Sequence, residues 1–212
     1  MNLSDYSDLL PEVQRRLKAG CEPHIMLAAL RHMGREFCER TSVWVQDLPT
    51  INLVAGQTEY SVISGDMPFE IAEITGWRTR TTEDIAAGRR GQTGRLEAIE
   101  YQPATFKATF ASTPSAVAVT GGLIFAAKLL PGFNLNEIPQ WIIRQWAFGL
   151  AAGAAWDISN SPSDPRCYDA EIAQAQRIQY EDAVVNAIDF VASKGKDVPI
   201  VMHKGFRMMG GS

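Results

Sequence analysis

The residues with the most potential for chemistry lie near the N-terminus, where Cys21, His24, His32 and Cys38 fall close together. Thiolate and imidazole groups are the usual ligands of zinc, whose donors must converge within about 2.0–2.3 Å of one ion. Residues 26–38 have helical spacing, and on a helix the two histidines would lie about 12 Å apart along the axis. His32 and Cys38 would point roughly 240° apart around it. We therefore expect no metal site here.

Signatures of catalytic sites are missing from the sequence. It contains neither the G-x-S-x-G elbow of serine hydrolases nor the H-E-x-x-H motif of zinc proteases. The carboxylates are scattered and mostly lie beside arginines, as in solvated ion pairs. The third histidine, His203, falls in a C-terminal stretch without periodicity, which is a poor place to hold a general base. We expect the protein not to be an enzyme and to need no cofactor.

A glycine- and arginine-rich run, GRRGQTGR, covers residues 88–95. It resembles a phosphate-binding loop in composition only, because it lacks the Lys-Ser/Thr pair and does not open a helix after a strand. Such runs usually mark exposed loops, and the alternative is weak contact of Arg89, Arg90 and Arg95 with a DNA backbone. The net charge of −4 argues against a general nucleic-acid binder.

Three cysteines, Cys21, Cys38 and Cys167, show no regular spacing. Their odd number predicts free thiols in a reducing compartment. The N-terminus lacks the pattern of a signal peptide, and the longest apolar run, residues 146–156, is about half as long as a bilayer span. We expect a protein made in the cytoplasm, with no membrane partner.

The spacing of apolar residues predicts two helices within residues 1–42. The first covers residues 9–17, and Gly20 stops it. The second begins at Pro23, because a proline in the first turn leaves no amide hydrogen unpaired. Its apolar side chains recur every three or four residues: Met26, Leu27, Leu30, Met33, Gly34, Phe37 and Cys38.

Residues 43–133 are rich in strand signals. The expected strands lie around Trp44 and at residues 53–62, 69–78, 116–120 and 123–130. Gly121 and Gly122 separate the β-prone runs VAVT and LIFA, which predicts a two-residue hairpin turn. Residues 79–95 are expected to form a loop, and residues 96–113 a short helix, a strand or both in turn. Together they predict a β-rich insertion folded as a small sandwich or barrel-like sheet.

Residues 134–193 are expected to return to helix, with Asn136 as the cap and Pro139 in the first turn. The helix from Trp141 to Asp157 is apolar nearly all round and must be buried on most sides. A chain of this size can hardly surround one helix, so we expect another subunit to cover part of it. The expected interface residues are Trp141, Trp146, Gly149 and Gly153.

The last helix is expected to run from an Asp164–Pro165 cap to about Ala192. Its apolar stripe consists of Tyr180, Ala183, Val184, Ala187, Ile188 and Val191. Residues 194–212 carry four Lys or Arg residues and one Asp and show no periodicity. We expect them to form an extended tail without structure of its own.

The segment of residues 27–62 resembles the head–tail adaptor proteins of tailed bacteriophages. In that family a helix ending in R-E-F-C-x-R-T leads into a strand with a Trp and then an L-V-A-G-Q-x-E-Y hairpin. The matching residues are Arg35, Glu36, Phe37, Cys38, Arg40, Thr41, Trp44, Leu53, Val54, Ala55, Gly56, Gln57, Glu59 and Tyr60. Residues 9–23, 121–131, 138–158 and 168–191 are similar too, whereas residues 79–115 and the tail depart.

The resemblance implies an α+β fold: a four-helix core, residues 1–42 and 134–193, with the insertion at 43–133 and the tail at 194–212. It implies a ring of about a dozen copies beneath the portal protein, in the neck of the virion. Such a ring prolongs the channel for double-stranded DNA and presents a platform to tail, nozzle or tail-terminator proteins. The tail would then dock on the portal through Ile200, Val201, Phe206 and Met208.

Two alternatives remain open. One is a neck or tail-completion protein of the same virion, which binds the adaptor from below. The other, which the sequence favours less, is a non-viral cytosolic module that binds a partner or small ligand. An acidic chain is compatible with the adaptor, because a conduit must let DNA slide rather than grip its phosphates.

Overall fold

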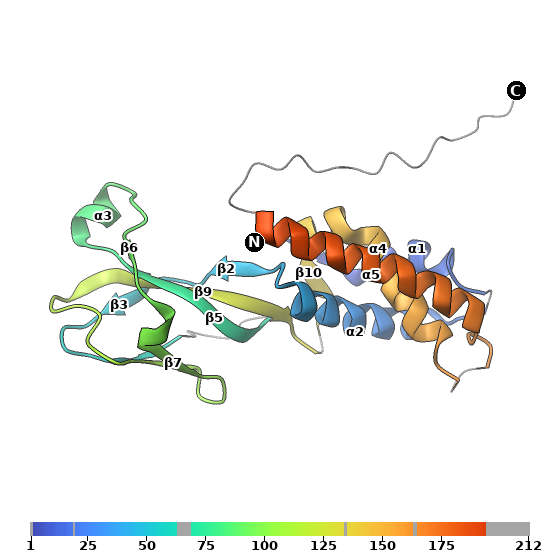
Figure 1. Cartoon of the computed structure of the whole chain (residues 1–212), viewed down its shortest axis with the longest axis horizontal. Coiled ribbons are helices and arrows are strands. Elements are labelled where there is room, and N and C mark those ends of the chain that lie inside the picture. Colours follow the sequence, from blue (N-terminus) through green and yellow to red (C-terminus); the bar gives the residue numbers. More distant parts are fainter. Residues whose placement is uncertain (1, 19, 63–68, 134, 163–164, 194–212) are drawn as a thin grey trace, which may run out of the picture.

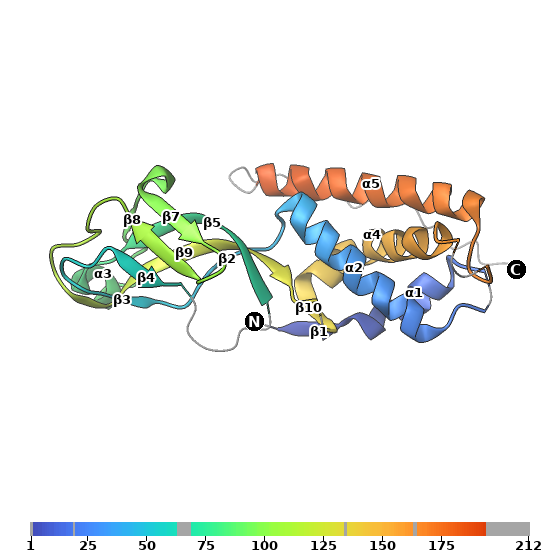
Figure 2. The same ribbon diagram turned by 90° about the horizontal axis from the view of Figure 1, so that it is seen from below.

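The computed structural model describes residues 2–18, 20–62, 69–133, 135–162 and 165–193. The molecule is elongated, with a helical lobe at one end and a β lobe at the other (Figures 1 and 2). The α+β fold class is confirmed, and the β lobe lies in the chain between the two pairs of helices.

The helical lobe contains the helices that the sequence predicts, with changed boundaries. Its elements are η1 Tyr6–Leu9, α1 Leu10–Gln14, α2 Pro23–Thr41, α4 Gln140–Ser159 and α5 Ala170–Ser193. Helix α2 begins at Pro23 as predicted and ends where Ser42 adopts a left-handed conformation at φ 51°. In Figure 2, α4 lies between α5 and α1.

The predicted caps of the last two helices are wrong. Helix α4 starts only after strand β10, Glu137–Pro139, which pairs antiparallel with β1, Leu3–Asp5. Asn136 does not cap it, and its carbonyl accepts a hydrogen bond from the Tyr6 amide at 2.7 Å. Helix α5 begins beyond the predicted Asp164–Pro165 pair, because the carboxylate of Asp169 accepts hydrogen bonds from the first amides of the helix.

The β lobe contains two antiparallel sheets. One has the order β2-β9-β5-β6 with β3 also paired to β9, and the other has the order β4-β8-β7. The strands are β2 Val45–Asp47, β3 Ile51–Leu53, β4 Glu59–Ser61, β5 Phe69–Thr79, β6 Gln92–Thr93, β7 Ile99–Gln102, β8 Lys107–Phe110 and β9 Val119–Pro131. Aromatic rings pack between the sheets: Phe110 lies 4.8 Å from Trp77 and 6.0 Å from Phe125 between ring centroids.

The predicted hairpin at Gly121-Gly122 is wrong, because β9 continues through both glycines. Gly121 has φ +63°, and a Cβ on Gly122 would lie 2.9 Å from the side chain of Leu53. The register between β3 and β9 shifts at this point. The glycines therefore form an irregularity that lets β3 approach, while β5 pairs with residues 123–131 of β9.

The stretch of residues 79–113 is more ordered than the sequence indicates. The expected loop contains helix α3, Thr82–Ala86, and strand β6. The Thr81 and Asp84 side chains cap α3 reciprocally. Residues 96–113 form a short helix and strands in turn, beginning with η2, Leu96–Ala98.

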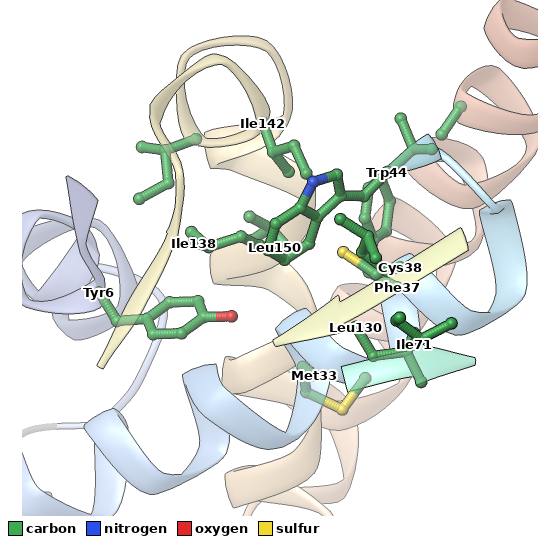
Figure 3. Close-up of a cluster of buried hydrophobic side chains, with 14 of the residues drawn as sticks. Tyr6, Met33, Phe37, Cys38, Trp44, Ile71, Leu130, Ile138, Ile142 and Leu150 are labelled. Atoms are coloured by element: carbon green, nitrogen blue, oxygen red, sulfur yellow. The ribbon is translucent and has the colours of Figure 1, made fainter. Parts of the chain in front are cut away.

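One continuous core joins the two lobes (Figure 3). Phe37 and Cys38 of α2 are buried there with Ile71 of β5 and Leu130 of β9. Trp44, in the connection between α2 and β2, is also buried. The centroid of its ring lies 5.6 Å from that of the Phe69 ring. Because both lobes contribute to the same core, they form a single packed unit.

The prediction of three free thiols is wrong. Cys21 and Cys167 form a disulfide with their Cα atoms 5.7 Å apart, and Cys38 remains free and buried. The disulfide ties the segment before α2 to the connection between α4 and α5. Nothing in the spacing of the cysteines shows that these segments meet, because they are 146 residues apart in the sequence.

Candidate assembly surfaces

The features of this chain that can act on other molecules are surfaces. Among the described residues, no three His, Cys, Asp or Glu side chains gather in a way that could hold a metal ion. Within the same residues, no helix combines the length and hydropathy needed to cross a bilayer.

The segment that carries the resemblance builds the joint between the lobes. Phe37, Cys38 and Trp44 fill the shared core. The Tyr60 hydroxyl is within hydrogen-bond distance of the carbonyls of Val54 and Gln57, at 3.2 and 3.3 Å. These contacts hold the connection between β3 and β4 closed, which explains why the tyrosine follows the glycine turn at that distance.

Arg35 fastens α2 to the β lobe. Its guanidinium donates to the carbonyl of Pro131 at 2.8 Å and to the carboxylate of Glu70 at 2.6 Å. It also lies 3.8 Å from the ring centroid of Phe133. The sequence pattern does not indicate this role, because the partners of Arg35 are 96 and 35 residues away in the chain.

The exposed side of α4 forms the first candidate surface, which we call the α4 patch. It consists of Trp141, Arg144 and Phe148, at positions i, i+3 and i+7 of one helix face. Phe148 is 70% exposed and Trp141 is 37% exposed. Arg144 is exposed and forms no ion pair within the described part of the chain. At the edge of the patch, the Arg16 guanidinium lies 5.9 Å from the Phe148 ring.

The small residues of α4 serve contacts inside the chain. A Cβ on Gly149 would lie 2.3 Å from the Ala183 Cβ, and one on Gly153 would lie 2.7 Å from the Tyr180 ring. Trp146 is half-buried, with its ring 5.7 Å from that of Phe37. Gly149 and Gly153 therefore let α5 approach α4 and do not face another subunit. Of the predicted interface residues, Trp141 lies on the exposed side.

The outer side of α5 forms the second candidate surface, which we call the α5 stripe. It consists of Ile178, Asp182, Val185 and Asp189, at positions i, i+4, i+7 and i+11. Ile178 and Val185 are 58% and 56% exposed. Neither aspartate forms an ion pair with any described residue. The stripe therefore alternates apolar and acidic side chains along three turns of helix.

The buried side of α5 agrees in part with the predicted stripe. Tyr180, Val184 and Ala187 are buried as predicted, whereas Ile188 is exposed. Beside them, Arg40 of α2 forms an ion pair with Glu181. The hydrogen bond from Arg40 lowers the pKa of the Glu181 carboxyl, and burial raises the pKa of Tyr180. This network holds one side of α5 against α2, so the α5 stripe on the opposite side of the helix faces away from the bundle.

Three arginines, Arg89, Arg90 and Arg95, lie in the chain on either side of β6 and form what we call the arginine cluster. Helix α3 and strand β6 lie at the end of the β lobe that is farthest from the helical lobe (Figure 1). Arg89, Arg90 and Arg95 are exposed. The Arg89 amide donates to the Asp84 carbonyl at 2.8 Å, and the Arg95 carbonyl accepts from the Trp77 indole at 2.9 Å. The backbone of this connection is therefore held while its cations face outward, and DNA contact remains a prediction.

The predicted docking residues of the tail, Ile200, Val201, Phe206 and Met208, lie outside the described residues.

No protein-family model matches the chain, and no curated protein matches its sequence. Among solved structures, it is similar to a chain in the neck of an empty GTA particle computed with C6 symmetry. The sequences are 17% identical over 85% of this chain and 95% of that chain, with a TM-score of 0.29. At a TM-score this low, we infer neither fold nor function from the likeness.

Proposed function

We propose that this chain is a structural protein of the neck of a tailed-phage-like virion. In this proposal it is a head–tail adaptor, and about a dozen copies form a ring beneath the portal. The ring extends the DNA channel and offers the tail a platform.

The observation that carries the proposal is the pair of exposed surfaces on a rigid chain. The α4 patch and the α5 stripe both combine large apolar side chains with charges, and they lie on different helices of one bundle. Exposed apolar side chains rimmed by polar groups are typical of sites that bind other proteins. A subunit with two different contact surfaces can join two neighbours, as a ring requires.

The resemblance of residues 27–62 supports the same proposal. Its matching residues have a common physical task, which is to join the helical and β lobes. Arg35, Phe37, Cys38 and Trp44 lie at that joint. A joint of this kind gives each copy one fixed shape, which is what repeated assembly into a closed ring needs.

The proposal also gives roles to the net charge of the chain, to the C-terminal tail and to the three exposed arginines. A net charge of −4 suits a channel through which DNA must pass without being held. In the proposed assembly, the tail docks on the portal through Ile200, Val201, Phe206 and Met208. The cations Arg89, Arg90 and Arg95 provide brief, non-specific contact with the DNA backbone.

The test is to mix the purified chain with portal rings and to examine the mixture by sedimentation and electron microscopy. The proposal expects co-sedimentation and an extra ring layer on one side of the portal, with the portal's symmetry. A chain from which residues 194–212 are deleted should lose this binding if the tail docks there. Failure of the full chain to bind portal contradicts the adaptor role. Binding only to portals that already carry an adaptor would instead identify a tail-completion protein.

A further inference from the structure

In the α4 patch and the α5 stripe, a charged side chain lies between two apolar ones, and the two charges are opposite. Along α4 the patch runs apolar, cationic, apolar, and the first three residues of the α5 stripe run apolar, acidic, apolar. In each set the two apolar side chains are seven residues apart, or about 10 Å along the helix. In the α4 patch the charge is three residues from the first apolar side chain, and in the α5 stripe it is four.

This difference matters because it disappears when the helices run antiparallel. Counted backwards along α5 from Val185, the charged residue Asp182 is three residues away. The second apolar residue, Ile178, is seven residues away. Every position of the patch then has a complementary partner: Trp141 meets Val185, Arg144 meets Asp182, and Phe148 meets Ile178. In a parallel arrangement, the charged pair would be out of register by one residue.

These pairs cannot form within one chain. Helices α4 and α5 of the same chain already contact each other through other faces, with Gly149 against Ala183 and Gly153 against Tyr180. The α5 stripe lies opposite the buried residues Tyr180 and Val184 and faces away from the bundle. The complementary surfaces must therefore come from different molecules.

We infer that the α4 patch of one copy binds the α5 stripe of a second copy, with the two helices antiparallel. The contact removes Phe148 and Ile178 from water, and the Arg144–Asp182 pair sets its register and excludes other partners. Aromatic and arginine side chains such as Trp141 and Arg144 are the residue types that contribute most to protein interfaces.

The contact is heterologous, because it uses two different surfaces. When two copies bind, the first still has its stripe free and the second still has its patch free, so the association continues until a ring closes or a filament forms. The inference names the surfaces of the proposed ring and rests on the proposed function only for the closure of that ring. The contact itself needs no other protein and can be tested with the purified full-length chain.

The first test is a charge exchange in the full-length chain. Arg144→Asp and Asp182→Arg, made singly, should each weaken self-association at least tenfold in sedimentation velocity. The double variant, and an equimolar mixture of the two single variants, should recover it. Glu97→Arg, a charge reversal at an exposed residue of the β lobe, is the matched control and should retain wild-type association. Single variants that associate like the wild type, or a double variant that stays as weak as the single ones, would overturn the inference.

The second test uses cross-linking to distinguish this contact from a symmetrical one. Phe148→Cys with Ile178→Cys should give a ladder of dimers, trimers and larger species after oxidation, because each copy links to two neighbours. Phe148→Cys with Val185→Cys, about 10 Å out of register, should cross-link at least tenfold more slowly. A product that stops at dimers, or equal rates for both pairs, contradicts the inference.

The two proposals can fail separately. If the charge variants still form normal rings on the portal, the interface is wrong and the adaptor function stands. If the cross-linked ladder forms but the chain never binds portal, the interface stands and the adaptor function fails.

Discussion

Gly34 of α2 provides a sharp test of how the N-terminal segment packs. The Tyr6 ring lies against this glycine, and a Cβ there would come within 2.2 Å of the hydroxyl oxygen. It would also lie 2.8 and 2.9 Å from Cζ and Cε1 of the same ring. Tyr6 is fully buried, and its amide is bonded to the Asn136 carbonyl, so the ring cannot swing away freely.

The expected magnitude for Gly34→Ala follows from two opposing effects. Overpacking a filled core costs about 1–3 kcal/mol, and three ring atoms within contact distance place this site at the upper end. Replacing glycine by alanine within a helix stabilises it by about 1 kcal/mol. The net expectation is a loss of about 2 kcal/mol in the free energy of unfolding, which lowers Tm by about 4–8 °C.

Tyr6→Phe separates the contributions of the ring and the hydroxyl. The hydroxyl is buried and has no hydrogen-bond partner within the described part of the chain, so its removal should leave stability unchanged or higher by up to about 1 kcal/mol. The double variant should recover about half of the Gly34→Ala loss. The nearest atom is then gone, but two ring carbons still lie too close.

The assay is denaturant unfolding followed by circular dichroism for the four chains of this double-mutant cycle. Gly76→Ala is the control, because its Cβ would meet only Ala126 at 3.7 Å, and it should change stability by less than about 1 kcal/mol. The reasoning is refuted if Gly34→Ala is as stable as the wild type. It is also refuted if Tyr6→Phe and Gly34→Ala are simply additive.

Three further predictions concern the disulfide, the buried thiol of Cys38 and the joint between the lobes. Cys21→Ser should lower the free energy of unfolding by up to about 5 kcal/mol, because the disulfide between Cys21 and Cys167 closes a loop of 146 residues. Denaturant titration measures this loss, and a reductant should bring the wild-type chain to the same stability as the variant. Burial raises the pKa of Cys38 to about 12 from an ordinary value of 9.0. The neutral thiol is thus favoured in the fold. The contribution of this thiol to stability should be constant below pH 9 and fall as pH rises towards 12. Cys38→Ala should reduce that slope in thermal melts at several pH values, and an unchanged slope would exclude the thiol as its source. Arg35→Ala should cost about 2 kcal/mol through lost charged hydrogen bonds to Glu70 and the Pro131 carbonyl, whereas an unchanged unfolding midpoint would show that the joint does not need them.

Local patterns predicted the helices well because a helix repeats within a few residues. Pro23 and the apolar spacing of residues 26–38 define α2 without reference to the rest of the chain. The predicted and observed starts of α2 agree at Pro23. The long strand β5 likewise agrees closely with the predicted residues 69–78.

The errors arose where one local signal suits two structures. Gly121-Gly122 suits a hairpin turn or an irregular strand, and pairing with β3 and β5 selects the second. Asn136 is a good helix cap, but its carbonyl bonds to Tyr6 and the chain forms β10 first. In each case the deciding partner is distant in the sequence, so no window of local residues contains the answer.

The candidate surfaces, too, could be predicted from the sequence only in part. The sequence by itself determined that α4 is apolar nearly all round, that the chain is acidic, and that residues 27–62 resemble those of an adaptor. Only the tertiary structure decided which side of α4 is covered. It buried Gly149 and Gly153 under α5 and left Phe148 and Trp141 exposed. Burial depends on which helices pack together, and that is a property of the whole chain rather than of any one segment.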